Sequence, residues 1–385
     1  MEFIDLKAQQ KQLFEDKRSL RDEIDRRIKL VLDNGKFILG PEVKELEKKL
    51  AEYVGVKHCI GVSSGTDALL VALMALGIGP GDEVITTPFS FFSTIETIVL
   101  LGAKPIFVDI EKNTYNLDPT KVEDAITKKT KAIIPVSLYG QPANFTSINF
   151  IASSYNITVI EDGAQSFGSN HQKKRSCGLS TIGTTSFFPS KPFGCYGDGG
   201  ACFTDDNNLA KTMREISLHG QNKRYNHHKI GINGRLDTIQ AAVLLAKLPL
   251  FEKEVYLRER LGKSYTNKLN QKGFNNTPYI EECNSSVYAQ YTIQVEHREK
   301  IIDFLKDKGI PTAIHYPILL PDQPALNKKK KGFLHSLLNT KMYKTFNIEN
   351  ARRLSSRVMS LPFYPNLKEQ DQDYIIDSLV ESIKV

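Results

Sequence analysis

The sequence predicts an α/β protein with a mostly parallel sheet that helices cover on both faces. Between residues 58 and 204, short apolar runs alternate with longer helical stretches. This alternation is typical of parallel strands buried between helices. The length of 385 residues also allows one large and one smaller domain, with a core that needs no disulfide or metal for stability.

The elements follow one another along the first 204 residues. Residues 41–54, PEVKELEKKLAEYV, predict a helix, because Pro41 suits a first turn and Val43, Leu46 and Leu50 fall on one face. Helices are also predicted at 66–76 and 92–101. The predicted strands are HCIGV (58–62), EVITT (83–87), PIFVD (105–109), KAIIPVS (131–137), ITVIED (157–162), TTSFF (184–188) and GACFT (200–204).

The strand–helix rhythm weakens after about residue 250. Residues 251–385 mix long helical stretches with two or three strands, such as YAQYTIQV at 288–295. We therefore expect a large domain at 1–250 and a small C-terminal α+β domain at 251–385.

The composition is ordinary for a soluble globular protein, and we expect a cytoplasmic one. Hydrophobic residues make up 41% of the chain and charged residues 25%. The five cysteines include no CxxC pair, which favours reduced thiols, and neither a secretory signal nor a membrane span is predicted. The net charge of +7 is spread along the chain, and we interpret its one dense basic run, Lys328 to Lys331, as a solvated loop. We expect no binding to nucleic acid or membrane.

Small and polar residues follow the first predicted strand. Ser63, Ser64, Gly65 and Thr66 open the helix TDALLVALMAL. The backbone N–H groups and the dipole at a helix start favour an anion such as phosphate. The alternative, that Ser64 or Thr66 only caps the helix, stays open at this point.

Two later strands end in ionisable residues. Asp162, with Gln165 close behind it, ends ITVIED, and a buried carboxylate there needs a cation or strong donors. A helix cap or a structural ion pair would also satisfy it. Lys191 follows TTSFF, between Pro189 and Pro192, and a group of glycines comes next. A solvated lysine needs no such setting.

The carboxyl ends of parallel strands share one edge of a sheet, where ligands bind. An anion cup, a carboxylate and an amine at that edge match the phosphate, the ring nitrogen and the aldehyde of pyridoxal 5'-phosphate. A nicotinamide oxidoreductase is disfavoured, because no GxGxxG follows the first strand. His227 and His228 are adjacent, but no third ligand has suitable spacing, so we expect no metal site.

Nine motifs occur in order along nearly the whole chain: FIDLKAQQ, GKFILGPEVKELE, SSGTDAL, GDEVITTPFSF, VSLYGQPA, VIEDGAQSFG, SFFPSKPFGCYGDGGA, GINGRLDTIQAA and AIHYP. Together they resemble the DegT/StrS family of nucleotide-sugar aminotransferases. The resemblance implies an aspartate-aminotransferase-like fold (PLP fold type I) in the large domain.

The resemblance also implies roles for individual residues. Lys191 falls on the lysine that reacts with the cofactor's aldehyde, and Asp162 falls on the carboxylate that pairs with its ring nitrogen. These two are the expected catalytic residues. The other expected contacts are Gly65, Thr66 and Ser186 with the phosphate, Phe91 on the ring face, Gln165 on the ring oxygen, Asn233 with the phosphate from the partner subunit, and Arg235, His315 and Tyr316 with the substrate.

Simpler interpretations of some of these residues stay open. Phe89 could be confused with Phe91, and at least two of Phe89, Phe91 and Phe92 are expected in the core. Asn233 could only form a turn, and His315 could be structural.

The resemblance implies transamination of a UDP-linked 3-keto-hexosamine, either UDP-2-acetamido-2-deoxy-3-oxo-glucuronate or its unoxidised hexose. L-glutamate is the expected donor, and the product would serve synthesis of cell-surface glycans such as lipopolysaccharide O-antigen. A homodimer with shared active sites is expected. Amination at C4 and a non-catalytic regulator that binds the cofactor are the alternatives. Arg235, Arg224 or Lys223 could pair with a C6 carboxylate, whose presence stays open.

Two positions bear on these alternatives. Related sugar dehydratases of the same fold carry histidine in place of the lysine, and histidine cannot form the covalent link, so Lys191 favours transamination. Gly163 stands where the family usually has alanine. The loss of one methyl group is expected to change little chemistry.

Overall fold

A central sheet of eight strands confirms the predicted α/β class. The computed structural model describes residues 1–327 and 342–384. In the order in which they lie side by side, the strands are β1 (His58–Val62), β9 (Gly200–Thr204), β8 (Ile182–Ser186), β5 (Thr158–Asp162), β4 (Thr130–Ile134), β2 (Glu83–Thr86), β3 (Lys104–Phe107) and β13 (Lys344–Thr345). Neighbours from β8 to β13 run parallel, whereas β9 is antiparallel to β1 and β8. The sheet is therefore mostly parallel, as predicted, with one reversed strand.

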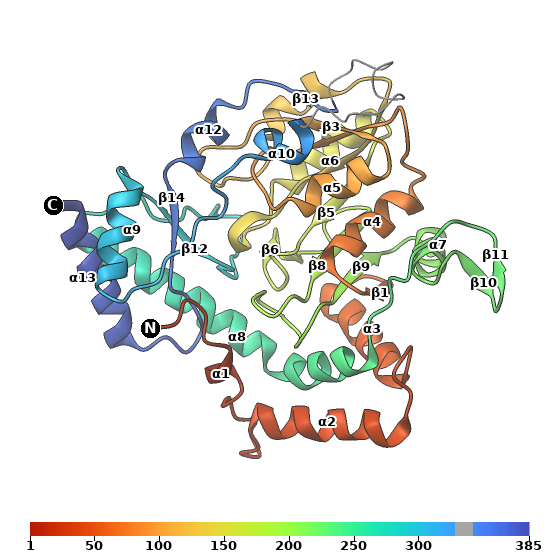
Figure 1. The fold of residues 1–385 in the computed structure, drawn as a ribbon, viewed down its shortest axis with the longest axis horizontal. Helices are drawn as coiled ribbons and strands as arrows, with labels where there is room; N and C mark the ends of the chain where they lie inside the picture. Colours follow the sequence, from red (N-terminus) through yellow and green to blue (C-terminus); the bar gives the residue numbers. More distant parts are fainter. Residues whose placement is uncertain (328–341, 385) are drawn as a thin grey trace.

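Helices lie against both faces of this sheet (Figure 1). The helices are α1 (Leu6–Gln9), α2 (Leu20–Asn34), α3 (Pro41–Val54), α4 (Gly65–Ala75), α5 (Ser93–Leu100), α6 (Phe145–Ser154), α7 (Asn207–Ser217), α8 (Thr238–Gln271), α9 (Arg298–Asp307), α10 (Pro324–Asn327), α12 (Glu349–Ser355) and α13 (Glu369–Lys384). Buried side chains of α4 and α7 pack on one face of the sheet, and those of α3, α6 and α8 pack on the other. Successive residues of each strand thus enter different cores.

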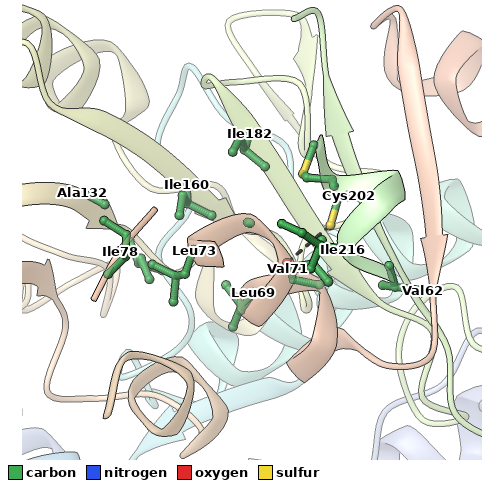
Figure 2. Packing of buried hydrophobic residues seen from close by; sticks show 14 of the residues in the cluster. Val62, Leu69, Val71, Leu73, Ile78, Ala132, Ile160, Ile182, Cys202 and Ile216 are labelled. Carbon is green, nitrogen blue, oxygen red and sulfur yellow. Dashed lines mark hydrogen bonds between the residues drawn. The ribbon is translucent and has the colours of Figure 1, made fainter. Parts of the chain in front are cut away.

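Helix α4 shows how one face of the sheet is covered. Its Leu69, Val71 and Leu73 are at most 2% exposed. Figure 2 shows them in the same cluster as Ile160 of β5 and Ile182 of β8. Burying each such side chain contributes about 1.5–3 kcal/mol to the free energy of unfolding. The apolar run that predicted a helix is therefore a core helix, and it fixes where the start of α4 lies.

The strands β2, β3, β4 and β8 end one to three residues before the predicted runs do, and the end of β8 matters most for the site. TTSFF was expected to be extended through residue 188, but β8 ends at Ser186. Phe187 still packs in the core, whereas Phe188 is 50% exposed. The backbone turns after Phe188, whose carbonyl accepts a 2.8 Å hydrogen bond from the N–H of Lys191. Lys191 thus lies in a tight turn at the carboxyl end of the sheet.

Part of the C-terminal region has a hydrophobic core of its own. The antiparallel pair β12 (Tyr291–Gln294) and β14 (Val358–Leu361) packs with α9, α13 and the end of α8. Helix α8 passes without a break through residue 250, and β13 joins the large sheet beside β3. The division into 1–250 and 251–385 stays a prediction. Two further short pairs are β6 (Asn170–His171) with β7 (Lys174–Arg175), and β10 (Gln221–Lys223) with β11 (Asn226–His227).

The basic run Lys328 to Lys331 lies outside the described residues. Within residues 1–327 and 342–384, no helix combines the length and the apolar character that a membrane crossing requires.

Candidate active site

One cavity of about 470 Å³ brings together most of the residues predicted from the sequence. It lies beside the carboxyl ends of β5 and β8 and the start of α4. The predicted residues that line it are Gly65, Thr66, Phe91, Asp162, Gln165, Ser186, Lys191, His315 and Tyr316. The cavity is also lined by Ser64, Leu69, Ser90, Ser93, Val136, Ala164, Phe188, Ser190, Asp198 and Gln290.

The start of α4 forms one wall of the cavity. The hydroxyl of Ser64 accepts a hydrogen bond of 3.0 Å from the N–H of Asp67, so Ser64 does cap the helix. A Cβ atom at Gly65 would lie 2.6 Å from the Cβ of Ser186, so only glycine allows α4 to approach the end of β8 this closely. The first N–H groups of a helix have no partner within the helix. The cap and the anion cup are therefore compatible: Ser64 binds one N–H group, while Gly65 and Thr66 line the cavity.

Asp162 and Lys191 are the oppositely charged pair of the cavity. Asp162 is 5% exposed and accepts hydrogen bonds from the Thr94 hydroxyl (3.1 Å) and the Ala164 N–H (3.2 Å). Burial raises the pKa of Asp162, although these donors and the charge of Lys191 oppose the shift. Burial lowers the pKa of Lys191, and the charge of Asp162 opposes it. Each group thus favours the ionised form of the other.

Helix α8 holds the loop that carries Lys191. The side chain of Gln240 accepts a 2.9 Å hydrogen bond from the N–H of Tyr196. The buried amine of Lys247 donates a short hydrogen bond to the carbonyl of Gly194. Because both partners lie on one long helix, the loop after Lys191 has a fixed position.

Gln165 links the cavity to residues far along the chain. Its amide nitrogen donates to the hydroxyl of Tyr316 (3.1 Å), and its carbonyl accepts from the N–H of Tyr139 (2.7 Å). The ring of His315 lies 3.0 Å from the hydroxyl of Ser360, and burial, followed by the charge of Lys191, lowers its pKa to about 4. His315 is therefore neutral near pH 7.

The structure separates the phenylalanines that the sequence could not. Phe91 lines the cavity, is 55% exposed, and has its ring centroid 6.0 Å from that of Tyr316. Phe89 is 1% exposed and packs in the core with Tyr115. Phe92 packs against the cluster that contains Phe107. Phe91 is thus the one of the three that a ligand in the cavity can reach.

Asn233 and Arg235 are not among the residues that line the cavity. Asn233 is exposed and pairs with Leu218 through the backbone. Arg235 is partly buried and pairs with Val62, and no described group accepts a hydrogen bond from its buried Nε. Among the described residues, Lys191 is the only lysine or arginine that lines the cavity.

Residues 18–380 match the model of the DegT/DnrJ/EryC1/StrS aminotransferase family. The chain belongs to this family. Its expected fold is also that of a solved DegT/DnrJ/EryC1/StrS aminotransferase from Brucella abortus, which is 39% identical with complete coverage of both chains and a TM-score of 0.91. NtdA from Bacillus subtilis, solved with bound cofactor PMP, is 32% identical, with a TM-score of 0.86 and coverage of 100% of this chain and 85% of that one.

Three curated relatives of the family carry informative names. UDP-2-acetamido-2-deoxy-3-oxo-D-glucuronate aminotransferase of Pseudomonas aeruginosa is 53% identical over 95% of this chain and 96% of its own length. A pleiotropic regulatory protein of Geobacillus stearothermophilus is 42% identical over 96% of each chain. UDP-N-acetyl-3-dehydro-alpha-D-glucosamine 3-aminotransferase of Acidithiobacillus ferrooxidans is 39% identical over 91% of each.

Some residues in or next to the cavity of this family member were not found from the sequence. Ser90 follows β2, so the strand-end rule that selected Asp162 and Lys191 could have found it. Thr94 lies inside α5 and Gln290 just before β12, where no local pattern marks them. The buried Oε1 atom of Gln290 has no hydrogen-bond partner among the described residues, which makes it a candidate ligand contact.

Proposed function

We propose that this family member binds pyridoxal phosphate in the cavity and transfers an amino group from L-glutamate to C3 of a UDP-linked 3-keto-hexosamine. The observation that carries the proposal is the meeting of Lys191, Asp162 and the start of α4 around one cavity. The names of the Pseudomonas and Acidithiobacillus relatives support a 3-keto UDP-sugar as the acceptor. The cofactor in the NtdA structure supports the choice of pyridoxal phosphate.

The residues present fit this cofactor. Gly65, Thr66 and Ser186 would hold its phosphate where Gly65 brings the start of α4 against β8. A buried carboxylate with two donors suits a protonated ring nitrogen, and Asp162 is such a group. Phe91 would cover the ring face, Gln165 would contact the ring oxygen, and Lys191 would bind the aldehyde.

Bound pyridoxal phosphate supplies an aldehyde that carries amino groups and a ring that draws electrons away from the neighbouring carbon. The chain supplies the proton transfers and the electrostatics. Once the amino group of the donor has displaced Lys191 from the aldehyde, the freed amine would take a proton from the α carbon of the donor and deliver it to the carbon that carried the aldehyde. The lowered pKa of the Lys191 amine makes it a better base near neutral pH than a solvated lysine. Asp162, when ionised, keeps the ring nitrogen protonated.

A homodimer with shared active sites completes the proposal. A UDP-sugar carries a diphosphate, yet Lys191 is the one lysine or arginine that lines the cavity within the described part of the chain. Arg235 and Asn233 lie outside the cavity of their own chain, so we assign them to the cavity of the partner subunit. Arginine suits phosphate and carboxylate groups equally well, so Arg235 is also our candidate for binding a C6 carboxylate.

The cell context follows from the same proposal. We place the enzyme in the cytoplasm, where it would supply an amino sugar for cell-surface glycans such as lipopolysaccharide O-antigen. A purely regulatory role is less well supported, although one relative is named a regulatory protein. A regulator could hold the cofactor with the same lysine and carboxylate, so turnover of an amino donor is the observation that separates the two roles.

The test is incubation of the purified protein with L-glutamate and a panel of keto-sugar nucleotides, followed by mass spectrometry. The panel contains 3-keto UDP-hexosamines with and without a C6 carboxylate and a 4-keto UDP-sugar. We expect amination of a 3-keto sugar together with release of 2-oxoglutarate. Amination of the 4-keto sugar alone would move the reaction to C4. Binding of the cofactor without turnover of any donor would leave only the regulatory role.

A further inference from the structure

Two buried hydroxyl groups form a chain that ends on the carboxylate of Asp162. The hydroxyl of Thr94 donates a hydrogen bond of 3.1 Å to Oδ2 of Asp162. The hydroxyl of Ser90 lies 3.1 Å from that of Thr94. Thr94 is fully buried and Ser90 is 5% exposed. Because Thr94 has a single proton and gives it to the carboxylate, Ser90 is the donor to Thr94.

The arrangement fixes both oxygens of the carboxylate. Oδ1 of Asp162 accepts the N–H of Ala164 at 3.2 Å, and Oδ2 accepts the hydroxyl of Thr94. One donor belongs to the backbone after β5 and the other to the first turn of α5. A carboxylate held from two separate elements cannot rotate freely. The lone pairs of Asp162 that accept neither hydrogen bond therefore keep a fixed orientation.

We propose that Thr94, supported by Ser90, is a positioning residue that directs the carboxylate of Asp162 at the ring nitrogen of the cofactor. The inference rests on the proposed function and adds Thr94, which lies outside the quoted family motifs, and a role for Ser90. A hydrogen bond to an ionised group stabilises the ionised form, which is the form that pairs with a protonated ring nitrogen. Thr94 itself is not among the residues that line the cavity.

The same helix offers a matched control. Thr97 is as fully buried as Thr94, but its hydroxyl donates to a carbonyl of its own helix, that of Ser93, at 3.1 Å. Thr94→Val and Thr97→Val therefore make the same chemical change in one helix. Only the first removes a donor from Asp162. Thr94→Ser keeps the hydroxyl and serves as the rescue.

The experiment compares two cofactors on protein freed of bound cofactor. Dissociation constants are measured for pyridoxal phosphate and for its 1-deaza analogue, in which a C–H group replaces the ring nitrogen. We expect Thr94→Val to weaken binding of pyridoxal phosphate about tenfold or more, which is typical of a lost hydrogen bond to a charged group. Binding of the deaza analogue changes less than about twofold, since it offers nothing to Asp162. Thr94→Ser and Thr97→Val match the wild type.

Two further variants keep the test decisive if Thr94→Val folds poorly. Ser90→Ala is also expected to weaken binding of pyridoxal phosphate more than binding of the deaza analogue, by a smaller factor than Thr94→Val does. Asp162→Asn is expected to show the same difference between the two cofactors, by a larger factor than Thr94→Val does. An equal loss for both cofactors in the Thr94 and Ser90 variants, or no loss, would overturn the inference. Failure of the wild-type protein to bind either cofactor would instead overturn the proposed function, and the inference with it.

Discussion

Asp162 and Lys191 enter one cavity from neighbouring strands of the sheet. Asp162 ends β5 and pairs with Thr184 of β8, and Lys191 lies in the turn that follows β8. The pKa of the acid is raised and that of the base is lowered, both chiefly by burial. Each therefore costs free energy when charged alone and less when both are charged. Such perturbed pairs in a cavity are typical of functional sites.

Lys191→Ala is expected to abolish transamination, with a loss of about a thousandfold or more, because it removes both the amine that binds the cofactor and the acid–base group. The fold is expected to stay intact, since burial already disfavours the charged amine. The measurements are 2-oxoglutarate release and thermal unfolding. Lys211→Ala, at an exposed position of α7, is the control and is expected to keep full activity. Substantial turnover by Lys191→Ala would defeat the assignment.

Arg235→Ala is expected to complement Lys191→Ala in mixed dimers. If each active site takes Lys191 from one subunit and Arg235 from the other, a heterodimer of the two variants has one intact site. Random mixing yields about half heterodimers, so about a quarter of the wild-type activity is expected. Subunit exchange is followed with two affinity tags. Proven exchange without any recovery of activity would show that the two residues do not meet in this way.

Gly163→Ala is expected to destabilise the fold by about 1–3 kcal/mol through overpacking. A Cβ atom at Gly163 would lie 2.6 Å from Sγ of Cys177 and 3.1 Å from the carbonyl of Thr184. The sulfur of Cys177 thus takes the space that a methyl group at position 163 would need. The free energy of unfolding is measured in urea for Gly163→Ala, Cys177→Ala and the double variant. The double variant is expected to be more stable than the sum of the single effects predicts; strict additivity would mean that the sulfur is not the obstacle.

Lys247→Met is expected to change how stability depends on pH. Burial lowers the pKa of Lys247 to about 8, below the value of about 10.4 of an unfolded chain. Between about pH 8 and pH 10 the unfolded chain therefore binds more protons at this site, and its contribution to stability rises with pH. As pH rises through this window, the free energy of unfolding of the wild type is expected to increase relative to that of Lys247→Met. Lys253→Met, at an exposed position of the same helix, serves as the control. Its curve of unfolding free energy against pH is expected to run parallel to that of the wild type. If the curve of Lys247→Met also runs parallel to that of the wild type, the lowered pKa of Lys247 is refuted.

Much of the fold and part of the site could be predicted from the sequence because both follow from local patterns. Apolar runs predicted the strands, and polar residues at their ends pointed to Lys191 and Asp162. Strand ends were less predictable. Phe187 is buried in the core although β8 already ends at Ser186, so an apolar residue need not belong to the strand it follows. The reversed direction of β9 also left no local mark, because direction depends on pairing with β1 and β8.

The order of strands and helices and the family motifs were determined by the sequence alone, since each depends on residues close together in the chain. The tertiary structure decided which of these residues share a cavity. It placed Thr94 on Asp162, Tyr316 on Gln165, Lys247 on the loop of Lys191 and Cys177 against Gly163. The physical reason is that hydrogen bonds and packing act over a few ångströms of space, whatever the distance along the chain.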